Sequence, residues 1–193
     1  AAGSKEQAVI VHIGDSHVQP GAITAPLRNF LQEEYGNAGR GHFFPYRVAK
    51  SNGPDGYSSF SGSSWTVTRI ALKKRTVPAG LSGFTLSSDQ PEAEFSITFN
   101  DPDMFGSGTN LLTLFHNKED SSAPFTVYTL PDSVFLKVND SLTSQTSVYT
   151  MAEPPLQIRV AAAPGDTGTT ATLFGMTLQI EEHTSELQSR QSI

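Results

Sequence analysis

The residues best suited to chemistry lie near the amino end of the chain, in the tetrapeptide Gly14-Asp15-Ser16-His17. An apolar run, residues 9–13, precedes it and predicts a buried strand that ends at the tetrapeptide. A serine in a sharp, glycine-assisted turn after a strand is held rigidly at the edge of a sheet, where a hydrolase presents its nucleophile. We therefore predict that Ser16 is a catalytic nucleophile.

A helix is expected soon after this turn, as a strand-turn-helix nucleophile site requires. Thr24 is a suitable cap, and Gly36 is a suitable end. Apolar residues recur at intervals of three and four, which predicts one apolar face formed by Leu27, Phe30, Leu31 and Tyr35. The opposite face, with Arg28, Gln32, Glu33 and Glu34, is expected to contact water.

The tetrapeptide resembles the first motif of the SGNH, or GDSL-type, serine esterases, with His17 where many members carry Leu. The continuation is similar to the bacterial branch that includes peptidoglycan O-acetylesterases. Its sequence is Tyr-Gly-Asn-Ala-Gly-Arg-Gly-His-Phe-Phe-Pro-Tyr-Arg over residues 35–47, then Asn-Gly-Pro over 52–54 and Ser-Gly-Ser-Ser-Trp over 61–65. In that branch a β-sandwich resembling a carbohydrate-binding module interrupts the hydrolase domain soon after the first motif.

The resemblance implies that the amide of Ser16 also contributes to the oxyanion hole and that Asp15 braces the turn. It further implies export to the periplasm or cell surface and an acyl ester of peptidoglycan or another polysaccharide as the substrate. The family takes its remaining oxyanion donors from later glycine and asparagine motifs and its base from an Asp-x-x-His. We find neither in this sequence, and we interpret residues 108–110 and 138–140, which partly resemble such a block, as turns. We therefore predict that the 193-residue chain alone is inactive.

None of the histidines that we considered is a strong candidate for the missing base. His17 is adjacent to Ser16, and neighbouring side chains in a turn diverge; His12 is expected to be packed within the first strand. His116 and His183 lack an Asp three residues earlier. His183 also lies in residues 181–193, a segment that resembles a translated sequencing adapter and that we expect to be artefactual or a disordered polar tail.

Composition excludes several classes of protein. A net charge of −6 and scattered basic residues argue against nucleic acid as a partner, and we interpret Lys73-Lys74-Arg75 as a solvated strand end. The chain has no cysteine, which excludes disulfides and thiolate metal sites, and it has no apolar run long enough to span a membrane. No cofactor or metal is predicted for the hydrolase. The sequence leaves open whether loop carboxylates such as Asp101, Asp103 or Asp140 hold a structural calcium.

The rest of the chain predicts a β-sandwich. A Gly- and Ser-rich stretch at residues 51–64 indicates a linker that ends the hydrolase fragment of residues 1–50. Short runs bounded by turn residues then follow at spacings typical of a sandwich, which we expect to be jelly-roll-like and to span residues 65–180. The predicted strands are residues 65–70, 93–99, 111–115, 125–130, 134–138, 147–151, 156–160 and 171–180. Trp65, Tyr128 and Tyr149 are its candidate sugar-stacking residues, although core or half-buried packing is the more ordinary role for each.

Two functions remain in competition. The first is that the chain is a fragment of a secreted serine esterase that removes acyl groups, plausibly O-acetyl groups, from polysaccharide. The second is that it is a non-catalytic carbohydrate-binding or surface-adhesion sandwich. An acyltransferase that uses the same serine is a third option, because water and an alcohol compete for the same acyl-enzyme.

Overall fold

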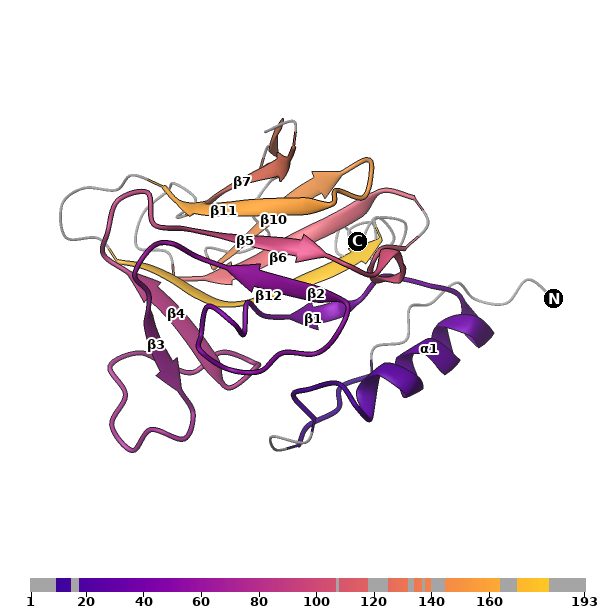
Figure 1. The fold of residues 1–193 in the computed structure, drawn as a ribbon, viewed down its shortest axis with the longest axis horizontal. Helices are drawn as coiled ribbons and strands as arrows, with labels where there is room; N and C mark the ends of the chain where they lie inside the picture. Colours follow the sequence, from indigo (N-terminus) through magenta and orange to yellow (C-terminus); the bar gives the residue numbers. More distant parts are fainter. Residues whose placement is uncertain are drawn as a thin grey trace, which may run out of the picture.

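The computed structural model describes residues 10–14, 18–106, 108–117, 125–131, 134–136, 138–139, 145–163 and 170–180. Within them, two antiparallel sheets form a β-sandwich, with one α-helix beside it (Figure 1). The predicted β-sandwich is therefore confirmed. Among these described residues, no helix is both long and apolar enough to cross a membrane.

The strands divide between the sheets as follows. One sheet has the order β3-β4-β12-β6-β10-β9, with β1 also paired to β12, and the other has the order β2-β5-β11-β7-β8. Their bounds are β1 Gly41–Phe43, β2 Tyr57–Phe60, β3 Thr66–Arg69, β4 Phe84–Ser88, β5 Glu94–Phe99, β6 Asn110–His116, β7 Phe125–Leu130, β8 Val134–Leu136, β9 Val138–Asn139, β10 Thr146–Met151, β11 Gln157–Ala162 and β12 Ala171–Ile180.

The longest strand, β12, organises the first sheet. It pairs with β6 along one edge, while the other edge is shared by β4, opposite residues 171–173, and by β1, opposite residues 176–178. A register shift between Leu173 and Gly175 separates these two segments. The imidazole of His42 packs against Gly175, where a Cβ would lie 2.6 Å from its Cε1 atom. Only glycine therefore allows β1 to approach at this point.

The core lies between the two sheets. Strands β5 and β11 alternate buried and partly exposed residues, which is the two-residue period of a sheet with one covered face. Phe43, Phe99 and Phe105 extend the core toward the amino end, with ring centroids 6.5 Å apart for Phe43–Phe99 and 4.9 Å for Phe99–Phe105. Strand β1 and the loop after β5 are therefore part of the same core as the later strands.

Helix α1, Thr24–Tyr35, lies outside the sandwich (Figure 1). The predicted helix and its end are confirmed: Gly36 has a φ of +96° and its N–H donates to the carbonyl of Gln32 at 2.9 Å. The predicted cap is wrong, because Thr24 is the first helical residue and Ile23 holds the capping position without a side-chain hydrogen bond.

The segment from Asn37 to Gly41 connects the helix to the sheet. The Asn37 side chain donates to the carbonyls of Asp103, at 2.9 Å, and Phe105, at 3.0 Å. Gly39 has a φ of +95°, and a Cβ there would lie 2.8 Å from the carbonyl oxygen of Leu178 and 2.9 Å from the Cα of Gln179. The backbone of this segment therefore packs directly on that of β12.

Two predictions for the part of the chain before residue 65 are wrong. Residues 10–14 form no strand and are exposed, because no neighbouring strand supplies the hydrogen bonds or covers the apolar side chains. Residues 51–64 are not only a linker, since they contain β2, and β1 lies within the segment that we had assigned to the hydrolase. Both strands carry core residues, Phe43 and Tyr57, and both are too short to give a periodic signal.

The eight strands predicted after residue 64 correspond to strands of the sandwich. One differs in detail: residues 134–138 hold two strands, with β8 in one sheet and β9 in the other. Residues 138–139 therefore form a strand and not the predicted turn. Strand β4 was not predicted, because its sequence, Phe-Thr-Leu-Ser-Ser, is polar at positions that are buried.

The packing of Gly39 on β12 gives the first prediction. Gly39→Ala should lower the free energy of unfolding by about 3 kcal/mol. The added Cβ would clash with the backbone of β12, and alanine would also be strained by the positive φ. Gly41→Ala is the matched control, because Gly41 has a φ of +75° but no atom lies within 4 Å of the position that a Cβ would take there. We expect it to cost only about 1 kcal/mol in urea unfolding. Equal losses in the two variants would contradict the proposed close packing.

Candidate functional site

The predicted nucleophile Ser16, with Asp15 and His17, lies outside the described residues. The flanking residues are described. Ile10, Val11 and Ile13 precede the tetrapeptide with 61%, 74% and 87% of their surface exposed. After it, the Gln19 amide donates to the Ser51 hydroxyl at 2.8 Å and to the carbonyl of Asn52. The chain is therefore fixed to the sandwich directly after the candidate nucleophile.

Helix α1 follows its amphipathic pattern only in part: Glu33 and Glu34 are exposed as predicted, but most of the apolar face is exposed as well. Its polar face contributes to the attachment: the Gln32 amide donates to Asn37 Oδ1 at 2.8 Å and to the carbonyl of Gly39 at 3.2 Å. Leu27, Phe30 and Tyr35 of its apolar face are 43%, 62% and 79% exposed, and Leu31 is half-buried. The prediction that Gln32 faces water is therefore wrong.

Two arginines create an unusual electrostatic environment beside this attachment. Burial lowers the pKa of Arg28, on the helix, to about 10, and repulsion by Arg40 adds to the effect, while Asp101 and Tyr57 oppose it. Burial likewise lowers the pKa of Arg40, whose guanidinium lies 5.3 Å from the centroid of the Tyr57 ring. The Arg40 Nε atom is buried without a hydrogen-bond partner. The predicted exposure of Arg28 to water is therefore wrong as well.

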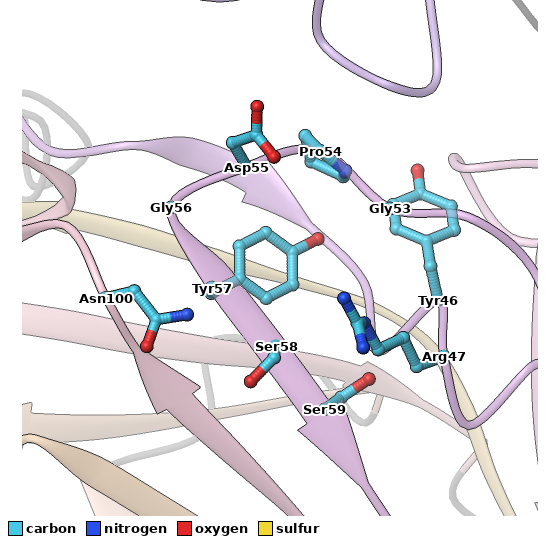
Figure 2. A pocket seen from close by; sticks show the side chains of 10 residues that line it. All are labelled: Tyr46, Arg47, Gly53, Pro54, Asp55, Gly56, Tyr57, Ser58, Ser59 and Asn100. Carbon is cyan, nitrogen blue, oxygen red and sulfur yellow. The ribbon is translucent and has the colours of Figure 1, made fainter.

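Tyr57 links this region to a pocket. Its hydroxyl donates to the carbonyl of Phe44 at 2.8 Å, and burial raises its pKa above the ordinary value. Tyr57 is one of the residues that line a pocket of about 120 Å³. Figure 2 shows the side chains that line this pocket. Its lining is mostly polar and comprises Tyr46, Arg47, Gly53, Pro54, Asp55, Gly56, Tyr57, Ser58, Ser59 and Asn100. This lining offers hydrogen-bond donors and acceptors to a polar group.

A serine and a histidine meet elsewhere in the fold, in a geometry that resembles part of a catalytic dyad. His116 Nε2 lies 2.8 Å from Ser147 Oγ, and its Nδ1 lies 3.0 Å from the carbonyl oxygen of Asn117. Because a carbonyl only accepts, Nδ1 carries the proton and Nε2 accepts from the serine hydroxyl. Both residues are 1% exposed, so no substrate can reach them. The pair is structural: it satisfies two polar side chains buried between β6 and β10.

The other histidines differ in their environments. His12 is exposed, so the prediction that it packs within a strand is wrong, and His183 lies outside the described residues. His42, which we had not singled out, has both ring nitrogens buried without a partner, and burial lowers its pKa. It lies in the Gly-rich block that carries the family resemblance. That location is the feature of the sequence that could have drawn attention to His42.

The candidate sugar-stacking residues are mostly packed. Tyr149 is fully buried and its hydroxyl donates to the Phe125 carbonyl at 2.7 Å. Trp65 is half-buried against Phe95, and the half-buried ring of Tyr128 is covered by the Arg159 guanidinium at 5.0 Å. These contacts confirm the more ordinary role that we gave to each residue.

The loop carboxylates and turns also have local roles. Asp101 Oδ1 accepts from the N–H of Asp103 at 3.0 Å and caps the short 3₁₀ helix Pro102–Met104. Asn110 is fully buried and donates to the Gly108 carbonyl at 2.9 Å. The predicted turn is confirmed only in part, since residue 108 lies in a bend but Asn110 is the first residue of β6. Among the described residues, no group of three or more His, Asp or Glu side chains is placed to hold a metal ion. Asp140 lies outside those residues.

Comparison with known proteins gives little further information. No family model matches the sequence, and no curated protein does. Among solved structures, the chain is similar to a family 89 glycoside hydrolase from Clostridium perfringens, with 10% identity and a TM-score of 0.35. That match covers 66% of this chain and 14% of the other protein. A likeness this weak carries no information about function.

The buried imidazole of His42 predicts a pH dependence of stability. In the unfolded chain a histidine titrates near pH 6.5, whereas burial lowers the pKa of His42 in the folded chain. Below about pH 6.5 the unfolded state therefore binds more protons, and the free energy of unfolding decreases as the pH falls. His42→Leu should reduce this slope in urea unfolding at several pH values, with His12→Asn, at an exposed position, as the control. If the free energy of unfolding of His42→Leu kept the same pH dependence, His42 would not be the group that destabilises the fold at low pH.

Proposed function

We propose that this chain belongs to a secreted serine esterase of the SGNH type that removes acyl groups, such as O-acetyl groups, from peptidoglycan or another polysaccharide. In this proposal Ser16 is the nucleophile and its amide is one oxyanion donor. The later sequence motifs that supply the base and the remaining donors in that family are not in these 193 residues.

The observation that carries the proposal is the uncovered apolar surface on both sides of the tetrapeptide. Before it, Ile10, Val11 and Ile13 are exposed; after it, helix α1 exposes Leu27 and Phe30, while Gln32 of its polar face bonds to the loop that follows the helix. A strand and a helix of an α/β hydrolase normally bury such residues against further strands and helices. In this proposal residues 10–13, which form no strand here, and helix α1 are the segments that the rest of the hydrolase domain would cover.

The sandwich has a positioning role in this proposal. The bonds of Gln19 and Asn37 attach the segment after the tetrapeptide and the end of the helix to it, so these two described segments keep a fixed relation to the sandwich. Asn37 lies within the Gly-rich block that carries the resemblance, and the partners of Gln19 are Ser51 and Asn52, which lie beside and within the Asn-Gly-Pro motif. In this proposal those motifs hold the nucleophile segment in place without being catalytic themselves.

Activity of the parent protein tests the proposal. The full-length protein should hydrolyse p-nitrophenyl acetate, and Ser16→Ala should lower kcat/KM at least about 10³-fold, because the nucleophile is lost. Ser147→Ala is the matched control, since it removes the buried serine that contacts His116. That control should keep the activity and only lose stability. Retention of activity in Ser16→Ala would refute the assignment.

A second function, carbohydrate binding by the sandwich without catalysis, is favoured by one observation. The pocket in Figure 2 brings Arg47, Asp55 and Asn100 around the buried ring of Tyr57. Sugar hydroxyls are bound by such combinations of planar polar side chains, and both proposed functions allow this pocket to contact the polysaccharide.

Binding to an immobilised polysaccharide tests this second function. The 193-residue chain should be retained by insoluble peptidoglycan, and Asn100→Ala with Arg47→Ala should reduce retention about tenfold, since each removes hydrogen bonds to the sugar. Gln90→Ala, an exposed polar residue outside the pocket lining, is the control. Equal retention of all three proteins would show that the pocket does not bind this glycan.

A further inference from the structure

The loop between β3 and β4, residues 70–83, exposes aliphatic side chains. Ile70, Leu72 and Leu81 are 65%, 46% and 80% exposed. In Figure 1 this loop, which we call the 70–83 loop, extends away from the sandwich beyond the ends of β3 and β4. Several exposed aliphatic residues on one projecting loop are a feature of surfaces that contact another apolar phase.

The same loop carries the highest local positive charge in the chain. Residues 56–88 include Arg69, Lys73, Lys74 and Arg75 and no Asp or Glu, although the whole chain has a net charge of −6. Lys73 and Lys74 are exposed. Arg69 instead donates to the carbonyl of Ala49 at 3.1 Å, so it supports the base of the loop. The exposed charges therefore lie directly beside Leu72.

Hydrogen bonds hold the loop in this form. The Ile70 N–H donates to the Gly83 carbonyl at 2.8 Å, and the Gly83 N–H donates to the Gly80 carbonyl at 2.9 Å. The second of these bonds closes a four-residue turn with Leu81 at its second position. Gly83 has a φ of +78°, and a Cβ there would lie 3.2 Å from the Ile70 side chain. Ile70 and Leu81 therefore flank the same turn, and the backbone keeps Leu81 exposed.

We propose that the 70–83 loop docks on the surface of an anionic phospholipid bilayer. Leu81, Ile70 and Leu72 would enter the interfacial region, while Lys73 and Lys74 contact the headgroup phosphates. Residues 66–83 contain no aromatic side chain, so the loop lacks the stacking face that sugar or nucleobase recognition uses. Aliphatic side chains combined with cations favour lipid over those ligands. The proposal goes beyond the esterase function and does not rest on it.

Vesicle flotation with the 193-residue chain tests the proposal. We expect it to float with vesicles of phosphatidylcholine and phosphatidylglycerol, to remain free with phosphatidylcholine alone, and to bind less as salt increases. Lys73→Ala with Lys74→Ala should weaken partitioning about tenfold or more, and Leu81→Ser about fivefold.

Matched controls distinguish binding through the 70–83 loop from the effects of net charge and of exposed apolar surface elsewhere on the protein. Asn29→Asp with Gln90→Glu changes the net charge by the same two units at exposed positions outside the loop. Leu156→Ser removes a leucine that is 72% exposed at the start of β11. Both should bind within about twofold of the parent chain. All of these positions are exposed, so thermal melts should be unchanged, and the comparison then reports binding and not folding.

Three results would overturn the proposal. The first is equal flotation with both kinds of vesicle, or with neither. The second is an equal loss in the charge control, which would show that net charge alone governs binding. The third is binding to soluble polyphosphate that competes with the vesicles and is unaffected by Leu81→Ser, which would make the loop a site for free polyanions.

Discussion

The close approach of one backbone segment to another determines where the amino-terminal part of this protein lies. Gly39 packs on residues 178–179 of β12 at a distance that excludes any side chain, and Asn37 fixes the adjacent loop through the carbonyls of Asp103 and Phe105. Strand β12 in turn pairs with β6, β4 and β1. The helix is therefore attached to the central strand of the larger sheet, and its orientation follows from that attachment and not from the amphipathic pattern of its sequence.

That orientation leaves the apolar side of α1 and residues 10–13 without cover. Exposed leucine, isoleucine and phenylalanine side chains have a cost in water of about 1.5–3 kcal/mol each relative to burial. The hydrogen bonds of Gln32 to the loop after the helix do not cover these apolar side chains. In the proposed esterase the same surfaces would contact the remaining strands and helices of the hydrolase domain, and the sandwich would hold the strand-turn-helix unit in place.

The buried polar groups show how position decides whether a reactive pair is chemical or structural. His116 and Ser147 have the spacing and tautomer of a general base and its nucleophile, yet both are inaccessible, and their hydrogen bond serves to satisfy polar groups within the first sheet. Arg40 and His42 differ from this pair, because their buried side chains are not satisfied. The Nε atom of Arg40 and both ring nitrogens of His42 have no hydrogen-bond partner. A pattern of residue types alone does not distinguish these situations.

The sequence by itself determined the β-sandwich, most of its strands after residue 64, and the helix with its end at Gly36, because these depend on local periodicity and on turn residues. It also singled out the candidate nucleophile by its motif. Tertiary structure alone decided that β1 and β2 belong to the sandwich, that residues 10–14 form no strand, and that Gln32 and Arg28 face inward. Short strands carry too few residues for a periodic signal, and a strand needs a partner that the sequence does not show. The face that a helix buries depends on the contacts available to it, here hydrogen bonds from a polar side chain to the loop that follows the helix.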